Sequence, residues 1–299
     1  MKDLEDFGFI KFNKKDYPLL KRSPLGNEGV IENEKGFERV YKSFISKSPF
    51  YVISGFRSDI KMHLGYKFLA ESLNFFSDLG GINYLINPKT EKLLMGDQIN
   101  PESGLKKTIF YSFLKNEKRV KIREDKFEGI DKLVLEVASI FTVKDILNRF
   151  KVNQEESINR VWGLIYASMS YFLPNLENET RYPTLILGNR SHANLILFAN
   201  EVARKKNLPP VSALFLNPIP GKDGSLKMSA SKPETAIYLE KLNRGIDNIK
   251  EGSTFLNCPF YEMGKYFVVE KELNEIKRKC EKKKNCKECK KKVIKKMKK

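Results

Sequence analysis

The sequence has no long apolar run and no apolar leader. Its longest apolar stretches, such as residues 193–199, contain polar residues and are far shorter than the roughly 20 residues that a membrane-spanning helix needs. The opening residues, MKDLEDFGF, lack the apolar core of a secretory signal. These absences argue against a membrane or secreted protein, so we expect a cytoplasmic protein with no membrane partner.

Cysteine is absent from the first 257 residues, and all four cysteines lie in the last sixth of the chain. A reducing cytosol disfavours disulfides between them. Cys286 and Cys289 have the two-residue gap of half a zinc site, which Cys280 or Cys258 would complete. Because a second matched pair is lacking, the spacing favours free thiols in a helical tail, and we predict no metal site.

Acidic residues are scarce at the carboxyl end. Residues 277–299 hold 14 Lys or Arg against two acidic residues, a net charge of +12 out of +18 for the chain. A polyanion such as RNA is the partner that such a tail favours. The alternative is a solvated, partly disordered end in a lysine-rich protein.

The remainder has the composition of a folded protein and no internal repeat. Short apolar runs predict buried strands, and runs with helical spacing follow them. The pattern favours an α/β fold, a doubly wound parallel sheet, with a helical C-terminal part. The predicted strands are 48–54, 82–86, 183–188 and 211–216, and the predicted helices include 62–79, 162–174 and 191–205.

The same pattern divides the chain into three parts. We expect an N-terminal lead-in at 1–45, which is charged and poorly patterned, and a Rossmann-like catalytic domain at 46–232. Residues 233–299 are expected to form a helical domain that contacts a polyanion such as RNA through its lysine-rich tail. The span 87–160 carries no chemistry that its pattern identifies.

Two segments carry chemistry. His63 and Gly65 follow the first predicted strand, at a helix N-terminus whose free N–H groups and partial positive charge suit a phosphate. The glycine admits a flat adenine, and the histidine can donate to a phosphate oxygen. Alone, this pattern is more often a helix cap or a packing residue.

The second segment is more specific. Lys227 is followed by Met228, Ser229, Ala230 and Ser231, after a loop rich in Pro and Gly. A mobile ammonium beside small hydroxyl donors can close over a triphosphate and stabilise the charge that develops on pyrophosphate. The segment also has the signals of a capped helix start, and the two interpretations are compatible.

Together the two segments resemble the His-Ile-Gly-His and Lys-Met-Ser-Lys-Ser signatures of class I aminoacyl-tRNA synthetases. The string 227–239, the run 50–55 and the stretch Cys-Lys-Glu-Cys-Lys at 286–290 are similar to the archaeal and eukaryotic tryptophanyl-tRNA synthetases. The resemblance covers residues 29–290. It implies ATP and Mg²⁺ as cofactors, tRNA and an amino acid, above all tryptophan, as partners, and a homodimer.

Carried over by position, the resemblance also implies site residues. His63 and Lys227 are expected to be catalytic. The amino-acid pocket is not carried over and stays unassigned, with Tyr51, Tyr166 and His192 as candidates. The expected ATP-binding residues are Gly55, His63, Gly65, Tyr66, Gly188, Met228, Ser229 and Ser231.

The sequence departs from the family at the site. Ser58, Asp59 and Ile60 replace Pro-Ser-Gly, and residues 188–192 replace Gly-Ile-Asp-Gln-Asp. The helix at 162–174 lacks the family's Gln and Asp. Two hypotheses stay open: an active ligase with a rebuilt pocket, or a catalytically impaired paralogue that binds RNA or regulates. A tyrosine enzyme or another nucleotidyl transferase is the remaining alternative.

Overall fold

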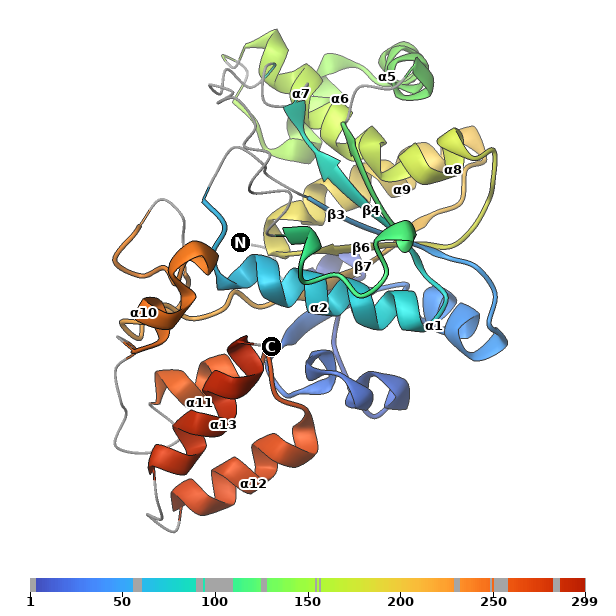
Figure 1. Ribbon diagram of the computed structural model, residues 1–299. Helices are drawn as coiled ribbons and strands as arrows, with labels where there is room; N and C mark the ends of the chain where they lie inside the picture. Colours follow the sequence, from blue (N-terminus) through green and yellow to red (C-terminus); the bar gives the residue numbers. More distant parts are fainter. Residues whose placement is uncertain are drawn as a thin grey trace.

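The computed structural model describes residues 4–55, 61–89, 94, 110–124, 128–153, 155, 157–228, 232–247, 249, 258–281 and 286–298 (Figure 1). A twisted sheet runs through the molecule, and helices cover both of its faces. The C-terminal helices form a separate group beside one face. Within the described residues, no helix is both long and apolar enough to cross a membrane.

The sheet has seven strands in the order β1-β2-β7-β6-β3-β4-β5. Strands β3 to β7 pair in parallel, whereas β2 pairs antiparallel with β7, and β1 pairs antiparallel with β2. Their bounds are β1 Ile10–Lys11, β2 Ile31–Lys35, β3 Tyr51–Gly55, β4 Ile82–Asn87, β5 Val120–Glu124, β6 Thr184–Gly188 and β7 Val211–Leu216. This arrangement confirms the doubly wound α/β sheet predicted from the sequence.

Alternation along the strands divides the core into two layers. Successive side chains of a strand point to opposite faces of the sheet. Val52 and Leu214 therefore pack in one layer with α1 and α2, while Ile53 and Phe215 pack in the other with the helices between β5 and β7. Because the parallel strands are buried on both faces, their apolar runs were readable in the sequence.

The helices take up most of the remaining chain. Those around the sheet are α1 Phe37–Ser46, α2 Leu64–Asp78, α5 Glu128–Ile140, α6 Val143–Phe150, α7 Ile158–Met169, α8 Leu173–Glu177 and α9 Ala193–Lys206. The C-terminal group comprises α10 Leu242–Asp247, α11 Pro259–Gly264, α12 Glu270–Glu281 and α13 Cys286–Lys298. The helical C-terminal part predicted from the sequence is thus present.

The described part of the expected lead-in, residues 4–45, is integral to the sheet. It supplies β1, β2 and most of α1, and its Phe37, Val40 and Phe44 are buried at helical spacing. The polar sequence of β2 does not look like a strand because β2 is antiparallel and close to the sheet edge. Residues 4–45 are therefore not a separate lead-in, because they contribute two strands to the sheet.

The helix predicted at 162–174 is interrupted. Helix α7 ends at Met169, a 3₁₀ turn follows at Ser170–Phe172, and α8 begins at Leu173. Pro174 lies in the first turn of α8, where its missing N–H costs no helical hydrogen bond, whereas in the interior of a longer helix it would. This break places Tyr171 beside the functional site described below.

Candidate functional site

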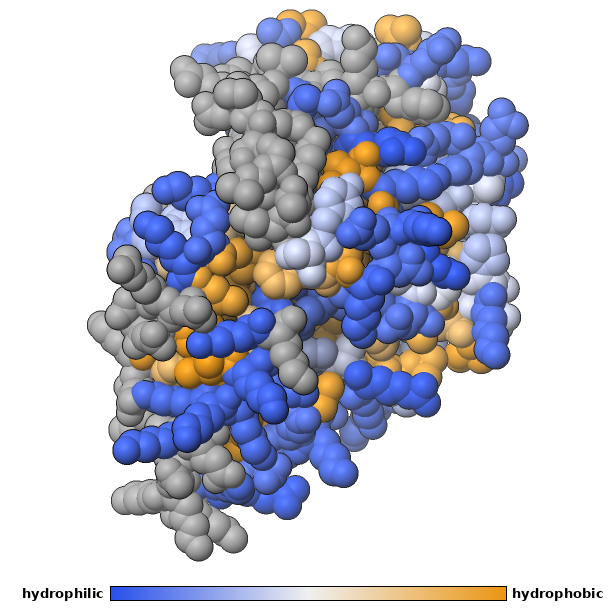
Figure 2. Space-filling view, viewed as in Figure 1, coloured by the Kyte–Doolittle hydropathy of each residue, from blue (hydrophilic) through white to orange (hydrophobic). Residues whose placement is uncertain are grey.

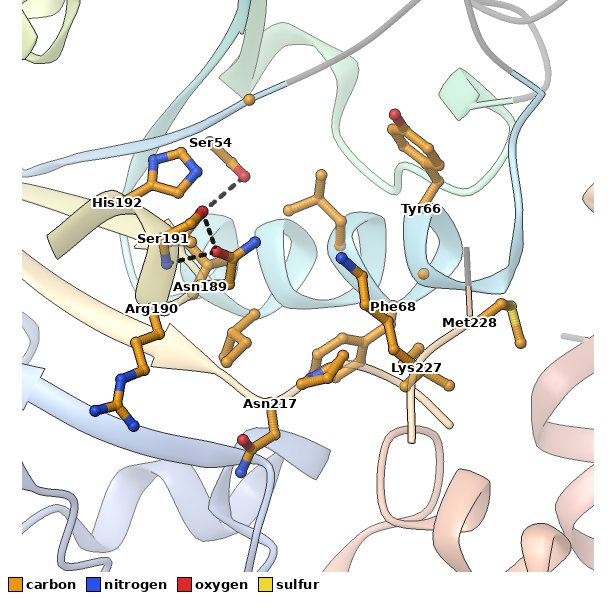
Figure 3. Close-up of a pocket in the computed structure, with 18 of the residues that line it drawn as sticks. Ser54, Tyr66, Phe68, Asn189, Arg190, Ser191, His192, Asn217, Lys227 and Met228 are labelled. Atoms are coloured by element: carbon orange, nitrogen blue, oxygen red, sulfur yellow. Dashed lines mark hydrogen bonds between the residues drawn. The ribbon is translucent and has the colours of Figure 1, made fainter. Parts of the chain in front are cut away.

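A cavity of about 560 Å³ lies at the carboxyl ends of β3 and β6 (Figure 3). The parallel strands lie in the order β7-β6-β3-β4-β5. The chain adds strands in one direction from β3 to β5 and in the other direction from β6 to β7, so the order reverses between β3 and β6. Open α/β sheets bind ligands at such a switch point, because the loops from the two strands part there. The volume lies within the range of small-molecule sites.

His63 caps helix α2 from the edge of this cavity. Its Nδ1 accepts a hydrogen bond from the Gly65 N–H at 3.0 Å, so that nitrogen carries no proton in the neutral ring. Burial and the nearby Lys227 ammonium lower the pKa of His63, which keeps the ring neutral. The single ring proton is therefore on Nε2, where it can be donated to a ligand.

Gly65 is required by the position of that ring. A Cβ atom at residue 65 would lie 2.6 Å from Cε1 and 2.9 Å from Nδ1 of His63. Any larger side chain would push the imidazole out of its capping position. The two residues that the sequence singled out thus form one unit.

The segment after the lysine loop is joined directly to this unit. His63 and Tyr238 form an antiparallel bridge, with Leu64 N–H donating to the Ile237 oxygen and Leu239 N–H to the Met62 oxygen, both at 2.9 Å. The two segments identified from the sequence are therefore parts of one structure, although 175 positions separate His63 from Tyr238.

Met228 anchors the loop that carries Lys227. Its N–H donates to the Ile219 oxygen at 2.7 Å, and its sulfur accepts from the Ile237 N–H at 3.4 Å. The side chain is 3% exposed and also lines the cavity. With Met228 fixed, Lys227 projects from an otherwise exposed loop toward the middle of the cavity (Figure 3).

The ionised side chains that line the cavity form two groups. The Lys227 ammonium lies near His63, while Arg190, which lies apart from Lys227 in Figure 3, forms an ion pair with Glu32 at 3.5 Å. The end that holds His63, Lys227 and the α2 N-terminus attracts anions. The cavity therefore has one end suited to anions and a second end that contains a carboxylate.

A smaller cavity of about 270 Å³ adjoins the first. The two share Ser54, Gly55, Leu187 and His192, and the lining of the smaller one is mostly apolar. His192 Nδ1 lies 2.8 Å from the Tyr171 hydroxyl. Burial lowers the pKa of His192, so a neutral imidazole separates the two cavities.

The other predicted residues fall into three groups. Gly55, Tyr66 and Gly188 line the larger cavity. Ser229 and Ser231, and the departures at 58–60, lie outside the described residues. Tyr51 and Tyr166 do not line either cavity.

The two tyrosines lie apart from both cavities. The Tyr51 hydroxyl bonds to Thr180 at 3.1 Å, within the layer of core opposite α2. The Tyr166 hydroxyl donates to Asp131 on α5. Both hydroxyls are thus directed away from the site, and of the three candidates His192 alone lines the cavities.

Several lining residues were missed in the sequence. Asn189 and Arg190 directly follow β6, and the carboxyl end of a parallel strand was a signal that could have identified them. Tyr171 and Glu32 had no comparable signal. Among the described residues no group of three or more His, Cys, Asp or Glu could hold a metal, and the side chain of Cys286 is not described.

We predict that the protein loses stability on mild acidification. The chain has only two histidines, and the pKa of each is lowered in the folded state. The unfolded chain, with histidine pKa values near about 6.5, then takes up protons first, so stability is full above that pH and falls below it. Two protons give a slope of up to about 2.7 kcal/mol per pH unit.

Urea unfolding between about pH 7.5 and 5.5 measures this slope. Replacing either histidine, as His63→Gln or His192→Gln, should reduce it by up to half. A free energy of unfolding that stays constant over this range would contradict the prediction.

Comparison with known proteins gives a family match and several similar structures. A model of the family described as tRNA synthetases class I (W and Y) matches residues 84–299. The tryptophan–tRNA ligase of Methanocaldococcus jannaschii is 24% identical over 317 residues, which cover 93% of this chain and 83% of that protein. A solved tryptophanyl-tRNA synthetase from Encephalitozoon cuniculi, bound to tryptophan, is 17% identical with a TM-score of 0.82, covering 99% of this chain and 90% of that one. The solved tryptophanyl-tRNA synthetase from Aeropyrum pernix K1 is 16% identical with a TM-score of 0.80, covering 99% of this chain and 89% of that one.

Proposed function

Because the chain belongs to the class I tRNA synthetases (W and Y), we propose that it activates an amino acid, most simply tryptophan, with ATP and transfers it to tRNA. The amino-acid carboxylate attacks the α-phosphorus of ATP, and the bond to the leaving pyrophosphate breaks. A terminal hydroxyl of tRNA then attacks the aminoacyl carbonyl and releases AMP. No protein nucleophile is needed, because positioning and charge stabilisation supply the catalysis.

The observation that carries this proposal is the proximity of His63 and Lys227 at the end of the cavity that attracts anions. The neutral His63 ring can donate its Nε2–H to a phosphate oxygen, and the Lys227 ammonium can stabilise the negative charge that develops on pyrophosphate. Mg²⁺ would be brought by the phosphates. The smaller cavity at His192 would take the amino-acid side chain.

Amino-acid-dependent exchange between ATP and pyrophosphate, run with each of the twenty amino acids, tests the proposal. We expect exchange with tryptophan alone. Exchange with another amino acid, including tyrosine, would keep the mechanism and change the substrate. If folded protein catalyses no exchange with any of them, the ligase is excluded and the impaired paralogue is left.

Transfer to tRNA requires a surface for the polyanion, which we assign to helix α13. Lys287, Lys291, Lys295 and Lys298 are exposed at spacings of four, four and three residues, so they form one stripe along the helix. Figure 2 shows hydrophilic side chains over this C-terminal group. The opposite face holds Val293 and Met297, both fully buried.

Replacing the four stripe lysines with alanine should weaken tRNA binding strongly and reduce its salt dependence. If each contacts one phosphate, the slope of log K against log salt falls by roughly 3. Lys292 and Lys296 on the same helix pair with Glu275 and Glu272 of α12. Their replacement is the control and should change the slope less. Equal effects from both sets would contradict the stripe as the contact.

The homodimer and the cytoplasmic location stay predictions from the resemblance and the sequence. Sedimentation of the purified chain, with and without tRNA, would measure the oligomeric state directly.

A further inference from the structure

Glu32 stands out among the residues that line the larger cavity, because it comes from the antiparallel strand β2 and not from a loop after a parallel strand. Ile31 pairs with Leu216 and Asn33 with Phe215, so Glu32 is the extra residue of a β-bulge. Bulges redirect a side chain, and they are frequent beside functional sites. The bulge accounts for a carboxylate at the rim of the cavity.

Arg190, in the 3₁₀ turn after β6, holds this carboxylate. Its Nη1 lies 3.5 Å from Glu32 Oε1, and the two side chains are 44% and 31% exposed. A surface pair of this kind adds little stability. Its effect is to fix the direction of Glu32, which leaves Oε2 and further lone pairs able to accept hydrogen bonds.

The ligand group at this position has to be a hydrogen-bond donor and cannot be a phosphate, which the carboxylate would repel. The phosphates belong with His63 and Lys227. Apolar side chains also line the cavity, among them Phe68 and Met228, and suit the flat base. The ribose joins the base to the phosphates, so in a nucleotide bent at this joint the ribose is the part that faces Glu32.

An amino acid in the smaller cavity would not reach this carboxylate. That cavity is lined from β3, β4 and β6, whereas Glu32 is on β2, and the sheet order β2-β7-β6-β3 separates β2 from β6, the nearest of these strands, by two strand spacings. Two spacings amount to about 9.5 Å. The donor is therefore part of the nucleotide.

Building on the proposed function, we propose that Glu32 binds the ribose hydroxyls of ATP and that Arg190 is its positioning residue. The vicinal hydroxyls would donate to the carboxylate, as acidic residues accept from ribose in other doubly wound folds. The site would thereby distinguish ribonucleotides from deoxyribonucleotides.

Calorimetric binding of ATP and of 2′-deoxy-ATP to the full chain tests this inference. A hydrogen bond to a charged group predicts that the wild type prefers ATP by about tenfold or more. In Glu32→Leu the preference should fall to near one, and in Glu32→Gln it should be intermediate. Glu28→Leu, an exposed acidic position on the same segment, is the matched control and should keep the wild-type ratio.

Arg190 has its own test. Arg190→Leu should lower the preference without abolishing ATP binding. The exchanged pair, Glu32→Arg with Arg190→Glu, returns a carboxylate to this place from the 3₁₀ turn after β6, and it should recover more of the preference than either single variant.

The outcomes separate the two proposals. A wild type that binds ATP but does not prefer it to 2′-deoxy-ATP overturns the ribose contact and leaves the ligase intact. If Glu32→Leu instead removes a preference for ATP over inosine triphosphate, Glu32 contacts the base and the ribose assignment is wrong. A folded wild type that binds no ATP overturns the proposed function, and this inference with it.

Discussion

Lys227→Ala is expected to lower tryptophan-dependent exchange between ATP and pyrophosphate by about 10²–10³-fold, while ATP binding to the resting protein weakens much less. The ammonium projects into the cavity from a loop that Met228 anchors. Its charge counts most when the bond to the leaving pyrophosphate breaks and negative charge accumulates there. Removing it therefore raises the barrier more than it weakens the ground-state complex.

Lys222 provides the matched control, since it lies in the same loop but does not line the cavity. Its backbone N–H donates to the Thr235 oxygen at 3.0 Å, a bond that an alanine retains. Lys222→Ala should leave the exchange rate within about twofold, because a surface substitution of this kind is nearly neutral. Equal losses in the two variants would show that the loop's overall charge matters, and not the position of Lys227.

Glu71→Leu is expected to lower the free energy of unfolding by about 3 kcal/mol, because it leaves a buried ammonium without its carboxylate. Lys67 and Glu71 lie one turn apart on α2 and pair at 3.0 Å, with side-chain exposures of 2% and 28%. The Phe113 ring, 4.6 Å from the Lys67 ammonium, compensates only in part.

Replacing both Lys67 and Glu71 should lower the free energy of unfolding far less than replacing Glu71 alone. Burial raises the pKa of Glu71, with Lys67 acting in the opposite direction. A carboxyl whose pKa is raised by folding stabilises the fold below its unfolded pKa, and this contribution is lost as the pH rises through the folded pKa. At neutral pH the ionised group is therefore a cost, so Lys67→Met with Glu71→Leu should stay within about 1 kcal/mol of the wild type.

Urea unfolding at neutral pH measures the free energy of unfolding of the wild type, of Glu71→Leu and of the double variant. Glu275→Leu breaks two exposed pairs, one of the same spacing with Lys279 at 3.5 Å and one with Lys292 at 3.0 Å, and should change stability far less than Glu71→Leu. A double variant as unstable as Glu71→Leu would mean that the ion pair itself stabilises the protein.

The parallel half of the sheet was predictable because its residues leave few alternatives. The strand predicted at 211–216 is β7 itself, and the one predicted at 183–188 is β6 with one residue more. Strands buried on both faces need unbroken apolar runs, and such runs bounded by Pro and Gly are rarely anything else. The class I synthetase prediction is confirmed by the family match.

The N-terminal strands could not be predicted on the same basis. β2 reads Ile-Glu-Asn-Glu-Lys, and its Asn33 and Glu34 are buried polar residues whose environment depends on distant segments. Glu34, for example, accepts from the Tyr17 hydroxyl and the Phe37 N–H. A polar strand of this kind is recognisable only when its partners are known.

The site was predictable where a backbone requirement fixes the residue type. The cap formed by His63 over Gly65 needs those two residues at that spacing, and Lys227 follows a loop held by Met228. Side chains that reach the cavity from elsewhere carried no such requirement. Tyr51 was a candidate because it is aromatic and close to Gly55 in sequence, yet its hydroxyl lies on the far side of the sheet at Thr180.

The bridge between His63 and Tyr238 also determines when the site can form during synthesis. Helix α2 and its histidine leave the ribosome early, but their partner strand and Lys227 follow only in the last third of the chain. Strands β1 and β2 likewise wait for β7, to which they are joined. At about 5–20 residues per second, a nascent chain lacks this bridge for many seconds after His63 has been made. Fragments released before residue 238 therefore lack the bridge that completes the proposed nucleotide site, however much of the central sheet they have folded.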